Sequence, residues 1–388
     1  MSPIRFFSLF LFSIFFLLSC ERKKNNDVLQ LPISEIVETN IRYAKGFSIE
    51  KSSDITVIKV NTPWPNSQET FTYALVDRNK LTSMTFSKGT YDAIIPTPIE
   101  KIVVTSTTHI PALEALGVEN KLIGFPETKY VSSKKTRKNI DRGNVRELGK
   151  NELINTEVLI DIAPDLVVGF SIDNQNKVYE NLQKSGIAVV FNGDWVEETP
   201  LGKAEWIKFF APFFNLEEKG DSIFSKIATE YNAIKNIAKK ATNVPTVISG
   251  AMYKDVWYMP AGDSWAGQFL ADANCNYLWS DTKGTGSLSL SIESVIEKGK
   301  SAEFWIGPSG FTSYKQLQEA NNHYTKFDAF KDEKTFTFSL TTGVTGGLLY
   351  YELGPNRPDI ILKDLIAIFH PDLLPNHKLF FFKPMETH

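Results

Sequence analysis

Aromatic side chains gather where the strands expected from the sequence come to an end. Ser, Thr, Asn and Gly are interspersed among them. Rigid rings combined with small polar groups suit a bulky, partly apolar ligand such as a macrocycle or a metal chelate. For each ring taken alone, packing in the core is the competing interpretation. The aromatic residues concerned are Phe125, Phe170, Trp195, Tyr253, Trp257, Tyr258, Trp265 and Phe311.

The segment Thr105-Ser-Thr-Thr-His109 follows the first strand of the expected parallel sheet. Ligands of open α/β folds bind outside the carboxyl ends of such strands. Thr107, Thr108 and His109 are therefore candidate ligand contacts. The alternative is a segment that caps the next helix and contains an incidental histidine, and the sequence leaves both interpretations open.

Motifs for catalysis and for metal binding are absent from the sequence. No dinucleotide fingerprint follows a strand, no Gly-Lys-Ser/Thr ends a phosphate loop, and no Gly-x-Ser-x-Gly elbow occurs. The 5 histidines lie far apart, whereas a site for a bare transition-metal ion draws on several imidazoles or carboxylates. Tyr350 and Tyr351 have no such ligands beside them, so we interpret the pair as packing. We expect no enzyme activity, no catalytic residue, no metal site and no resident cofactor.

The hydrophobic pattern predicts two α/β lobes joined by one long helix. Short apolar strands alternate with helices over residues 98–214 and again over residues 244–388, which is typical of parallel sheets covered on both faces. Residues 215–243 between them form an amphipathic helix with Asn215 as its expected cap. A further helix is expected over residues 153–162. The β-rich segments before residue 98 predict a small antiparallel meander.

The first residues have the pattern of a secretory signal. Arg5 precedes an apolar run over residues 6–18, which is too short for a permanent membrane span. The run ends in Leu-Leu-Ser before Cys20, which resembles the lipobox of bacterial lipoproteins. We therefore expect a signal peptide over residues 1–19 and a lipid anchor on Cys20. Residues 20–97 then hold a polar tether and the meander, and the body lies in the periplasm or at the cell surface.

The overall composition excludes two classes of protein. The chain has 388 residues, 42% of them hydrophobic, and a net charge of -3, which argues against a disordered chain and against a nucleic-acid binder. Cys275 has no partner within the mature chain and is interpreted as a small buried hydrophobe. We expect a monomer.

One stretch carries a family resemblance. Ala163-Pro164-Asp165-Leu166-Val167-Val168 and the order of elements over residues 98–371 resemble the iron-complex and cobalamin substrate-binding proteins of ABC importers. The resemblance implies two doubly wound lobes of the class III periplasmic-binding-protein type. It also implies that the lobes hold an iron-siderophore, a corrinoid or a haem-like molecule. In this family a glutamate on each lobe docks onto arginines of the permease, and the matching positions are Glu157 and Glu293.

The residues and the resemblance together predict a ligand cleft between the lobes. Because a single helix is stiffer than several flexible strands, we expect only modest closure on binding. The predicted ligand contacts are Thr107, Thr108, His109, Phe125, Trp195, Trp257, Tyr258 and Trp265.

Several features depart from the family pattern. The meander before residue 98 is longer than usual, and residues 351–359 cannot be assigned to ligand or structure. Arginine-rich pockets, which family members use for anionic siderophores, are not evident, so a ligand held by aromatic rings is favoured. A lipid-anchored hydrolase and a surface interaction module remain as alternatives, because a fold does not determine a function.

Overall fold

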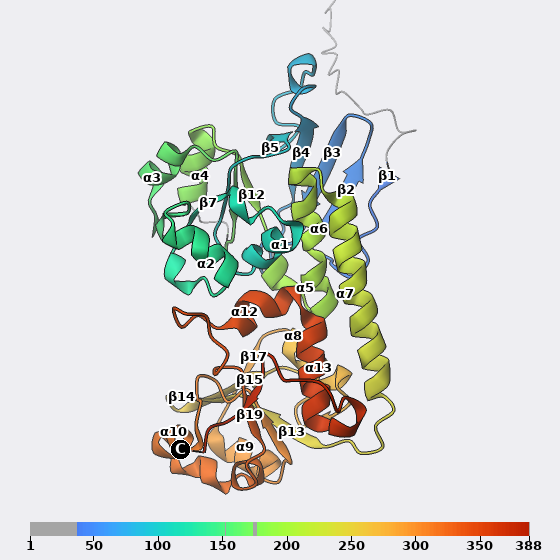
Figure 1. Ribbon diagram of the computed structural model, residues 1–388, viewed down its shortest axis with the longest axis vertical. Coiled ribbons are helices and arrows are strands. Elements are labelled where there is room, and N and C mark those ends of the chain that lie inside the picture. Colours follow the sequence, from blue (N-terminus) through green and yellow to red (C-terminus); the bar gives the residue numbers. More distant parts are fainter. Residues whose placement is uncertain (1–36, 152, 174–176, 388) are drawn as a thin grey trace, which may run out of the picture.

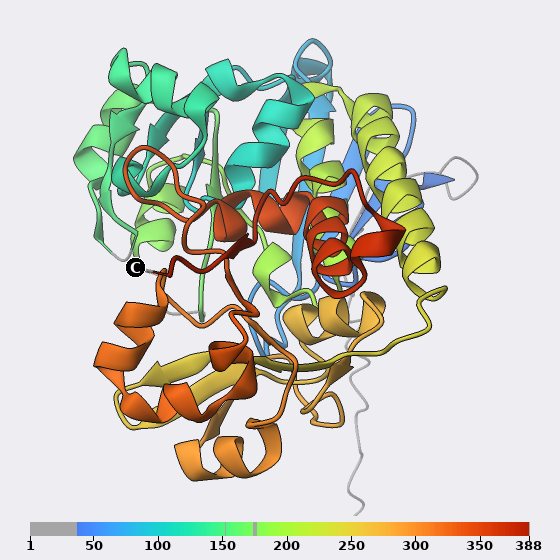
Figure 2. The same cartoon turned by 60° about the horizontal axis from the view of Figure 1, so that its bottom comes forward.

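The computed structural model describes residues 37–151, 153–173 and 177–387. The predicted signal peptide and the lipidation site at Cys20 lie outside these residues. Two α/β lobes are stacked along the long axis of the molecule (Figures 1 and 2). We call residues 98–214 the N-lobe and residues 244–387 the C-lobe. Helix α7 (Glu217–Ala238) runs beside both.

A five-stranded sheet precedes the N-lobe. Its order is β1 (Val37–Glu38), β2 (Phe47–Lys51), β3 (Ile55–Val60), β4 (Phe71–Asp77) and β5 (Ala93–Thr97). The antiparallel strands that the sequence predicts correspond to β2, β3 and β4. β5 pairs parallel to β4, because the connection between them crosses one face of the sheet and covers it with Leu81, Met84 and Phe86.

Two buried carboxylates attach this sheet to the N-lobe. Glu205 accepts hydrogen bonds from the backbone N–H groups of Tyr43 at 2.6 Å and Ala44 at 2.9 Å. Glu197 accepts from the next two backbone N–H groups, each at 2.8 Å. Since several amide donors compensate the desolvation of a carboxylate, these contacts hold the added sheet firmly.

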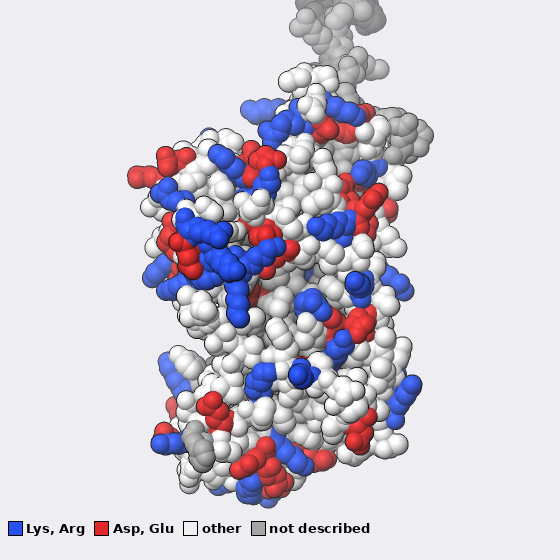
Figure 3. All heavy atoms as spheres, viewed as in Figure 1, with Lys and Arg blue, Asp and Glu red and all other residues white. Residues whose placement is uncertain are grey.

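The N-lobe is built on a five-stranded parallel sheet in the order β12-β11-β6-β7-β8. Its strands are β6 (Ile102–Val104), β7 (Leu122–Phe125), β8 (Arg146–Glu147), β11 (Leu166–Gly169) and β12 (Val189–Phe191). The central strands are buried on both faces, which explains their continuous apolar runs. The helices are α1 (His109–Leu116), α2 (Lys134–Asp141), α3 (Thr156–Ile162), α4 (Lys177–Lys184), α5 (Pro200–Glu205) and α6 (Ile207–Phe210). Lys and Arg side chains of α2 gather on the face drawn in Figure 3.

The helix predicted over residues 153–162 is wrong in its first turn. Residues Leu153–Ile154 form strand β10, which pairs antiparallel with β9 (Gly149–Lys150). Helix α3 begins only at Thr156, because the Asn155 side chain accepts a hydrogen bond from Val158 N at 3.1 Å and caps it there.

The C-lobe contains two sheets. The larger has the order β16-β13-β18-β19-β20 and is parallel apart from β20. Its strands are β13 (Thr246–Ser249), β16 (Asn276–Tyr277), β18 (Phe304–Ile306), β19 (Thr335–Thr337) and β20 (Lys383–Pro384). The smaller is antiparallel and consists of β14 (Ala251–Tyr253), β15 (Val256–Pro260) and β17 (Ser287–Leu290). The helices are α8 (Trp265–Asp272), α9 (Ile292–Gly299), α10 (Tyr314–Ala320), α11 (Asp328–Lys331), α12 (Leu349–Leu353) and α13 (Pro358–Phe369).

Helix α7 contacts both lobes. Lys219 Nζ donates a hydrogen bond to Leu116 O in the N-lobe at 2.7 Å, and Tyr231 Oη donates to Asp272 Oδ2 in the C-lobe at 2.6 Å. Asn215 does not cap this helix as predicted. It has a left-handed backbone, with φ of 56°, and ends the preceding 3₁₀ turn.

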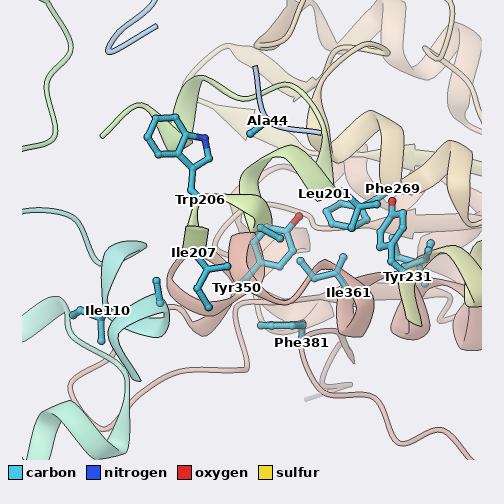
Figure 4. Packing of buried hydrophobic residues seen from close by; sticks show 14 of the residues in the cluster. Ala44, Ile110, Leu201, Trp206, Ile207, Tyr231, Phe269, Tyr350, Ile361 and Phe381 are labelled. Carbon is cyan, nitrogen blue, oxygen red and sulfur yellow. The ribbon is translucent and has the colours of Figure 1, made fainter. Parts of the chain in front are cut away.

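The two lobes share one hydrophobic core (Figure 4). Leu201 and Ile207 of the N-lobe helices lie in the same buried cluster as Tyr350, Ile361 and Phe381 of the C-lobe. Any large movement of one lobe against the other would expose part of this apolar surface to water.

The predicted fold class is confirmed: two doubly wound lobes with parallel sheets, a long connecting helix and a preceding β sheet. Among the described residues, every helix is too short or too polar to cross a membrane.

Candidate functional site

Two neighbouring cavities share Tyr351, and we call them together the cleft. The N-lobe cavity, of about 470 Å³, opens at the carboxyl ends of β6 and β7. The C-lobe cavity, of about 520 Å³, opens at the carboxyl ends of β13 and β18. Residues of both lobes line the first, and C-lobe residues line the second among those described. Tyr351 lines both cavities and is 53% exposed. The cleft therefore lies where open α/β sheets bind their ligands.

Aromatic rings and hydroxyl groups dominate the C-lobe cavity. The aromatic lining residues are Tyr253, Tyr258, Trp265, Phe269, Phe338, Tyr350, Tyr351 and Phe382. The Trp265 ring lies 5.6 Å from the Tyr350 ring, and Tyr350 stacks on Phe338 at 4.4 Å. Ser249, Ser264, Thr285, Ser287 and Ser309 supply hydroxyl groups. No Lys, Arg, Asp or Glu lines this cavity among the described residues, so it suits a ligand with a large uncharged surface.

The N-lobe cavity is smaller and, unlike the C-lobe cavity, has charged residues in its lining. Thr107, Phe125 and Phe170 line it from the ends of the parallel strands. Asn151 also lines it, and within the described part of the chain its buried Oδ1 atom has no hydrogen-bond partner. Since buried polar atoms are normally paired, this oxygen is available to a ligand or to water.

A segment of the C-lobe contributes the residues that the sequence did not assign. We call residues 341–353 the strap, which crosses from the C-lobe to the edge of the N-lobe near α2 (Figure 2). Gly346, Gly347 and Leu348 line the N-lobe cavity, and Tyr350 and Tyr351 line the C-lobe cavity. The interpretation of the tyrosine pair as packing holds for Tyr350, which is buried in the shared core. Tyr351 is exposed and lines both cavities, which the sequence did not indicate.

Four predicted ligand contacts line the cleft: Thr107 and Phe125 in the N-lobe cavity, and Tyr258 and Trp265 in the C-lobe cavity. Thr108 lines neither cavity. Its carbonyl oxygen accepts a hydrogen bond from Asn356 Nδ2 at 2.9 Å, and this bond connects the two lobes.

His109 does not face the cleft, which corrects the prediction. Helix α1 begins at this residue, and its side chain is 0% exposed, with its ring 5.5 Å from that of Phe210. Burial lowers the pKa of His109, against the opposing effect of the Asp194 carboxylate, so the imidazole is neutral at physiological pH.

Trp257 is also wrong as a ligand contact. It is 0% exposed, its Nε1 donates to Ser249 O at 3.0 Å, and its ring stacks on Trp305 at 5.4 Å. Successive side chains of a strand point to opposite faces, so Trp257 enters the core while Tyr258 faces the cavity. Trp195 is half-buried, lines neither cavity and lies 5.4 Å from the ring of Phe170.

Charges near the cleft are unevenly distributed. Glu127 and Glu352 are the charged residues that line the N-lobe cavity among those described. Lys134, Lys135 and Lys138 of α2 are exposed outside this lining, and Lys and Arg side chains gather on the N-lobe face drawn in Figure 3. In the described ranges no cluster of three or more His, Cys, Asp or Glu could hold a metal ion. Burial raises the pKa of the Cys275 thiol well above its usual value, consistent with a structural role.

Glu157 and Glu293 occupy equivalent positions on the two lobes. Each is exposed in the first turn of a helix, α3 and α9, that a side-chain cap begins. Neither forms an ion pair with another described residue. The N–H group of Glu293 itself and the Ser291 hydroxyl lower the pKa of the Glu293 carboxyl, which is therefore ionised at neutral pH.

Comparison with known families identifies the fold. The model of the periplasmic binding protein family matches residues 102–337. The chain belongs to the periplasmic binding protein family. This family has a solute-binding fold and is generally non-enzymatic. The match begins after the added β sheet and ends before the strap, so both features lie outside the part of this periplasmic binding protein that the family model covers.

Several relatives of this periplasmic binding protein are named lipoproteins. An uncharacterized lipoprotein of Methanocaldococcus jannaschii is 28% identical over 298 residues, which is 74% of this chain and 69% of the relative. A probable siderophore-binding lipoprotein of Bacillus subtilis is 25% identical over 186 residues, 46% of this chain and 52% of the relative.

Solved structures share the fold at low identity. A periplasmic haem-binding protein from Pseudomonas aeruginosa has a TM-score of 0.56 at 16% identity, covering 75% of this chain and 99% of its own. A possible iron-binding, periplasmic solute-binding protein from Staphylococcus epidermidis has a TM-score of 0.55 at 19% identity, covering 71% of this chain and 100% of its own.

Proposed function

We propose that this protein captures a bulky metal chelate or macrocycle in the cleft and delivers it, unaltered, to the permease of an ABC importer. The ligand is an iron-siderophore, a corrinoid or a haem-like molecule. The observation that carries this proposal is the pair of aromatic cavities that meet at Tyr351. We further propose that the protein acts as a monomer held at the membrane by a lipid on Cys20.

The lining of the cleft supports a ligand of this size and polarity. Two adjoining cavities of about 470 and 520 Å³ fall in the range that binds cofactor-sized molecules. Aromatic rings bind flat apolar surfaces, and the hydroxyl groups between them can orient polar substituents. The names of the Bacillus subtilis and Pseudomonas aeruginosa relatives agree with a siderophore or haem ligand.

The charges of the cleft favour a ligand held through its uncharged surface. Among the described residues no Lys or Arg lines either cavity, and the charged lining residues are Glu127 and Glu352. Aromatic rings and hydroxyl groups therefore supply the contacts expected to hold the ligand.

A binding panel tests the proposal. Purified protein is titrated with haemin, a ferric trihydroxamate and cyanocobalamin, and the quenching of tryptophan fluorescence is followed. We expect one of the three to bind with micromolar or tighter affinity. Failure of all three would overturn the proposed ligand class. Turnover of an ester or glycoside panel would favour the hydrolase, and capture of a defined protein partner would favour the interaction module.

Tyr351→Ala is expected to weaken binding of the probe that succeeds by roughly 30-fold, or about 2 kcal/mol, because a central aromatic contact is lost. Isothermal titration measures this change. Phe380→Ala is the matched control, since Phe380 is 40% exposed and lines neither cavity. An unchanged affinity of the Tyr351 variant would place the ligand elsewhere.

Small-angle scattering is expected to show little closure on binding. The shared core and α7 resist a large movement of the lobes. The radius of gyration, about 21 Å for a compact chain of this length, should change by no more than about 1 Å. A larger compaction with the bound probe would contradict this expectation.

A further inference from the structure

The strap is fitted closely to the N-lobe. A Cβ atom on Gly343 would lie 2.5 Å from Ser132 Cα, and one on Gly347 would lie 2.5 Å from Tyr130 O. No side chain larger than hydrogen fits at either position without displacing the backbone. The strap therefore touches the segment before α2 along its own backbone.

Glu352, near the end of the strap, makes two hydrogen bonds to the N-lobe. Its Oε2 atom accepts a hydrogen bond from Ser132 N at 2.6 Å, and its Oε1 atom accepts one from Ser133 N at 2.8 Å. The donors and the acceptor are separated by 220 and 219 residues and belong to different lobes. Glu352 is 3% exposed. Both oxygens of this buried carboxyl are thus paired with backbone groups of the other lobe, as buried polar groups normally are.

The surroundings of Glu352 provide no neutralising cation. Helix α1 contributes Glu114, whose Oε1 accepts a hydrogen bond from Thr136 Oγ1, and its negative charge repels Glu352. Helix α2 begins with Lys134 and Lys135, both exposed, and Lys135 is paired with Glu119. On the strap the ionisable neighbours are Tyr350 and Tyr351, and Glu127 and Tyr130 line the same cavity from the N-lobe. Glu352 has no ion-pair partner among the described residues.

We propose that Glu352 is a positioning residue, which locks the strap onto the N-lobe and thereby holds Tyr351 in the cleft. Tyr351 precedes it directly on α12, so the two amide hydrogen bonds determine where the phenol stands. A further hydrogen bond between the lobes, from Asn356 Nδ2 to Thr108 O at 2.9 Å, holds the 3₁₀ turn that follows α12. The inference deepens the proposed function and rests on it for the role of Tyr351 in binding.

The lock depends on pH. Burial raises the pKa of Glu352 to about 7, against the two amide hydrogen bonds, which lower it. Once undocked and solvated, the carboxyl returns to its ordinary value of 4.5. With the strap docked on the N-lobe, the Glu352 carboxyl thus binds a proton more tightly than it does in the undocked strap. Docking of the strap is therefore most favourable below the undocked pKa of 4.5, and it weakens as the pH rises through the docked pKa of about 7.

Amide hydrogen exchange of Ser132 and Ser133 reports the lock without any ligand. In the wild-type protein, protection corrected for intrinsic exchange should fall about tenfold between about pH 6 and about pH 8. Glu352→Ala should lower protection at either pH by at least about tenfold, because the acceptor is lost. Glu352→Gln keeps one acceptor oxygen, so its protection should be intermediate and independent of pH.

Glu147 provides an internal control. It accepts hydrogen bonds from Glu127 N at 2.8 Å and Thr128 N at 2.9 Å, within a single lobe. Burial acts to raise the pKa of Glu147, but its hydrogen bonds outweigh burial and lower it, so these two amides should show constant protection. Protection of β11 amides shows that each variant is folded.

Unchanged exchange at Ser132 and Ser133 in Glu352→Ala would overturn the lock, as would pH dependence that persists in Glu352→Gln. The probe that binds should lose about tenfold in affinity in Glu352→Ala, and an unchanged affinity would overturn the positioning role. If haemin, the ferric trihydroxamate and cyanocobalamin all fail to bind the wild-type protein, the proposed function is wrong. The hydrogen-exchange result would still show whether Glu352 locks the strap onto the N-lobe.

Discussion

Replacing Glu157 and Glu293 together by lysine is expected to abolish uptake while ligand affinity stays unchanged. Both carboxylates are exposed, lie on different lobes and have no ion-pair partner among the described residues. If they meet basic residues of the permease, two reversed charges turn attraction into repulsion, which costs several kcal/mol at an interface. Uptake of the binding probe by cells that carry the variant measures the effect.

The matched control reverses two other exposed glutamates, Glu180 on α4 and Glu319 on α10. Each lies on the same lobe as its counterpart, and its one ion pair among the described residues is with a lysine on its own helix. The control should transport normally. Normal uptake by the Glu157→Lys and Glu293→Lys double variant would reject docking through these residues.

Trp257→Ala is expected to lower the free energy of unfolding by about 3–5 kcal/mol, because it removes a large buried side chain and leaves a cavity. The indole stacks on Trp305, packs edge-on against Tyr324 and donates a hydrogen bond to Ser249 O. Chemical denaturation followed by circular dichroism measures this loss.

Tyr258→Ala is the control for Trp257, since the two residues are neighbours on β15 but point to opposite faces. Tyr258 is 41% exposed in the C-lobe cavity. Its variant should lose less than about 1 kcal/mol of stability, because exposed substitutions cost little, yet it should bind the probe less tightly. A Trp257 variant as stable as the wild type would show that the face of β15 is assigned wrongly.

The fold was predictable from the sequence because its signals are local. Helix α13 occupies residues Pro358–Phe369, where Pro358 marks the first turn and the apolar period continues to Phe369. Helix α7 follows its apolar stripe from Phe224 to Ala238. The boundaries were less accurate: Asn155 and Asn215 both have the chemistry of a cap, but only Asn155 begins a helix.

The cleft was only partly predictable. Thr107 follows β6 and Phe125 ends β7, so the topology alone places them at the sheet edge that binds ligands. Trp257 and Tyr258 are adjacent aromatic residues, and their sequence is compatible with either face of the strand. The burial of His109 could be predicted only by knowing where α1 begins. One residue separates Thr107, which lines the cavity, from His109, where the buried helix starts.

The strap could not be predicted from the sequence. No local pattern marks Tyr351, Glu352 or the adjacent glycines as functional. Their partners in the N-lobe, Tyr130, Ser132 and Ser133, lie more than two hundred residues away in the sequence. Composition, periodicity and caps determined that this chain forms two α/β lobes beside a long helix, because those forces act between residues close in sequence. Which side chains line the cleft was decided only when the lobes packed together, because contact between distant segments sets burial, and burial decides which groups meet a ligand.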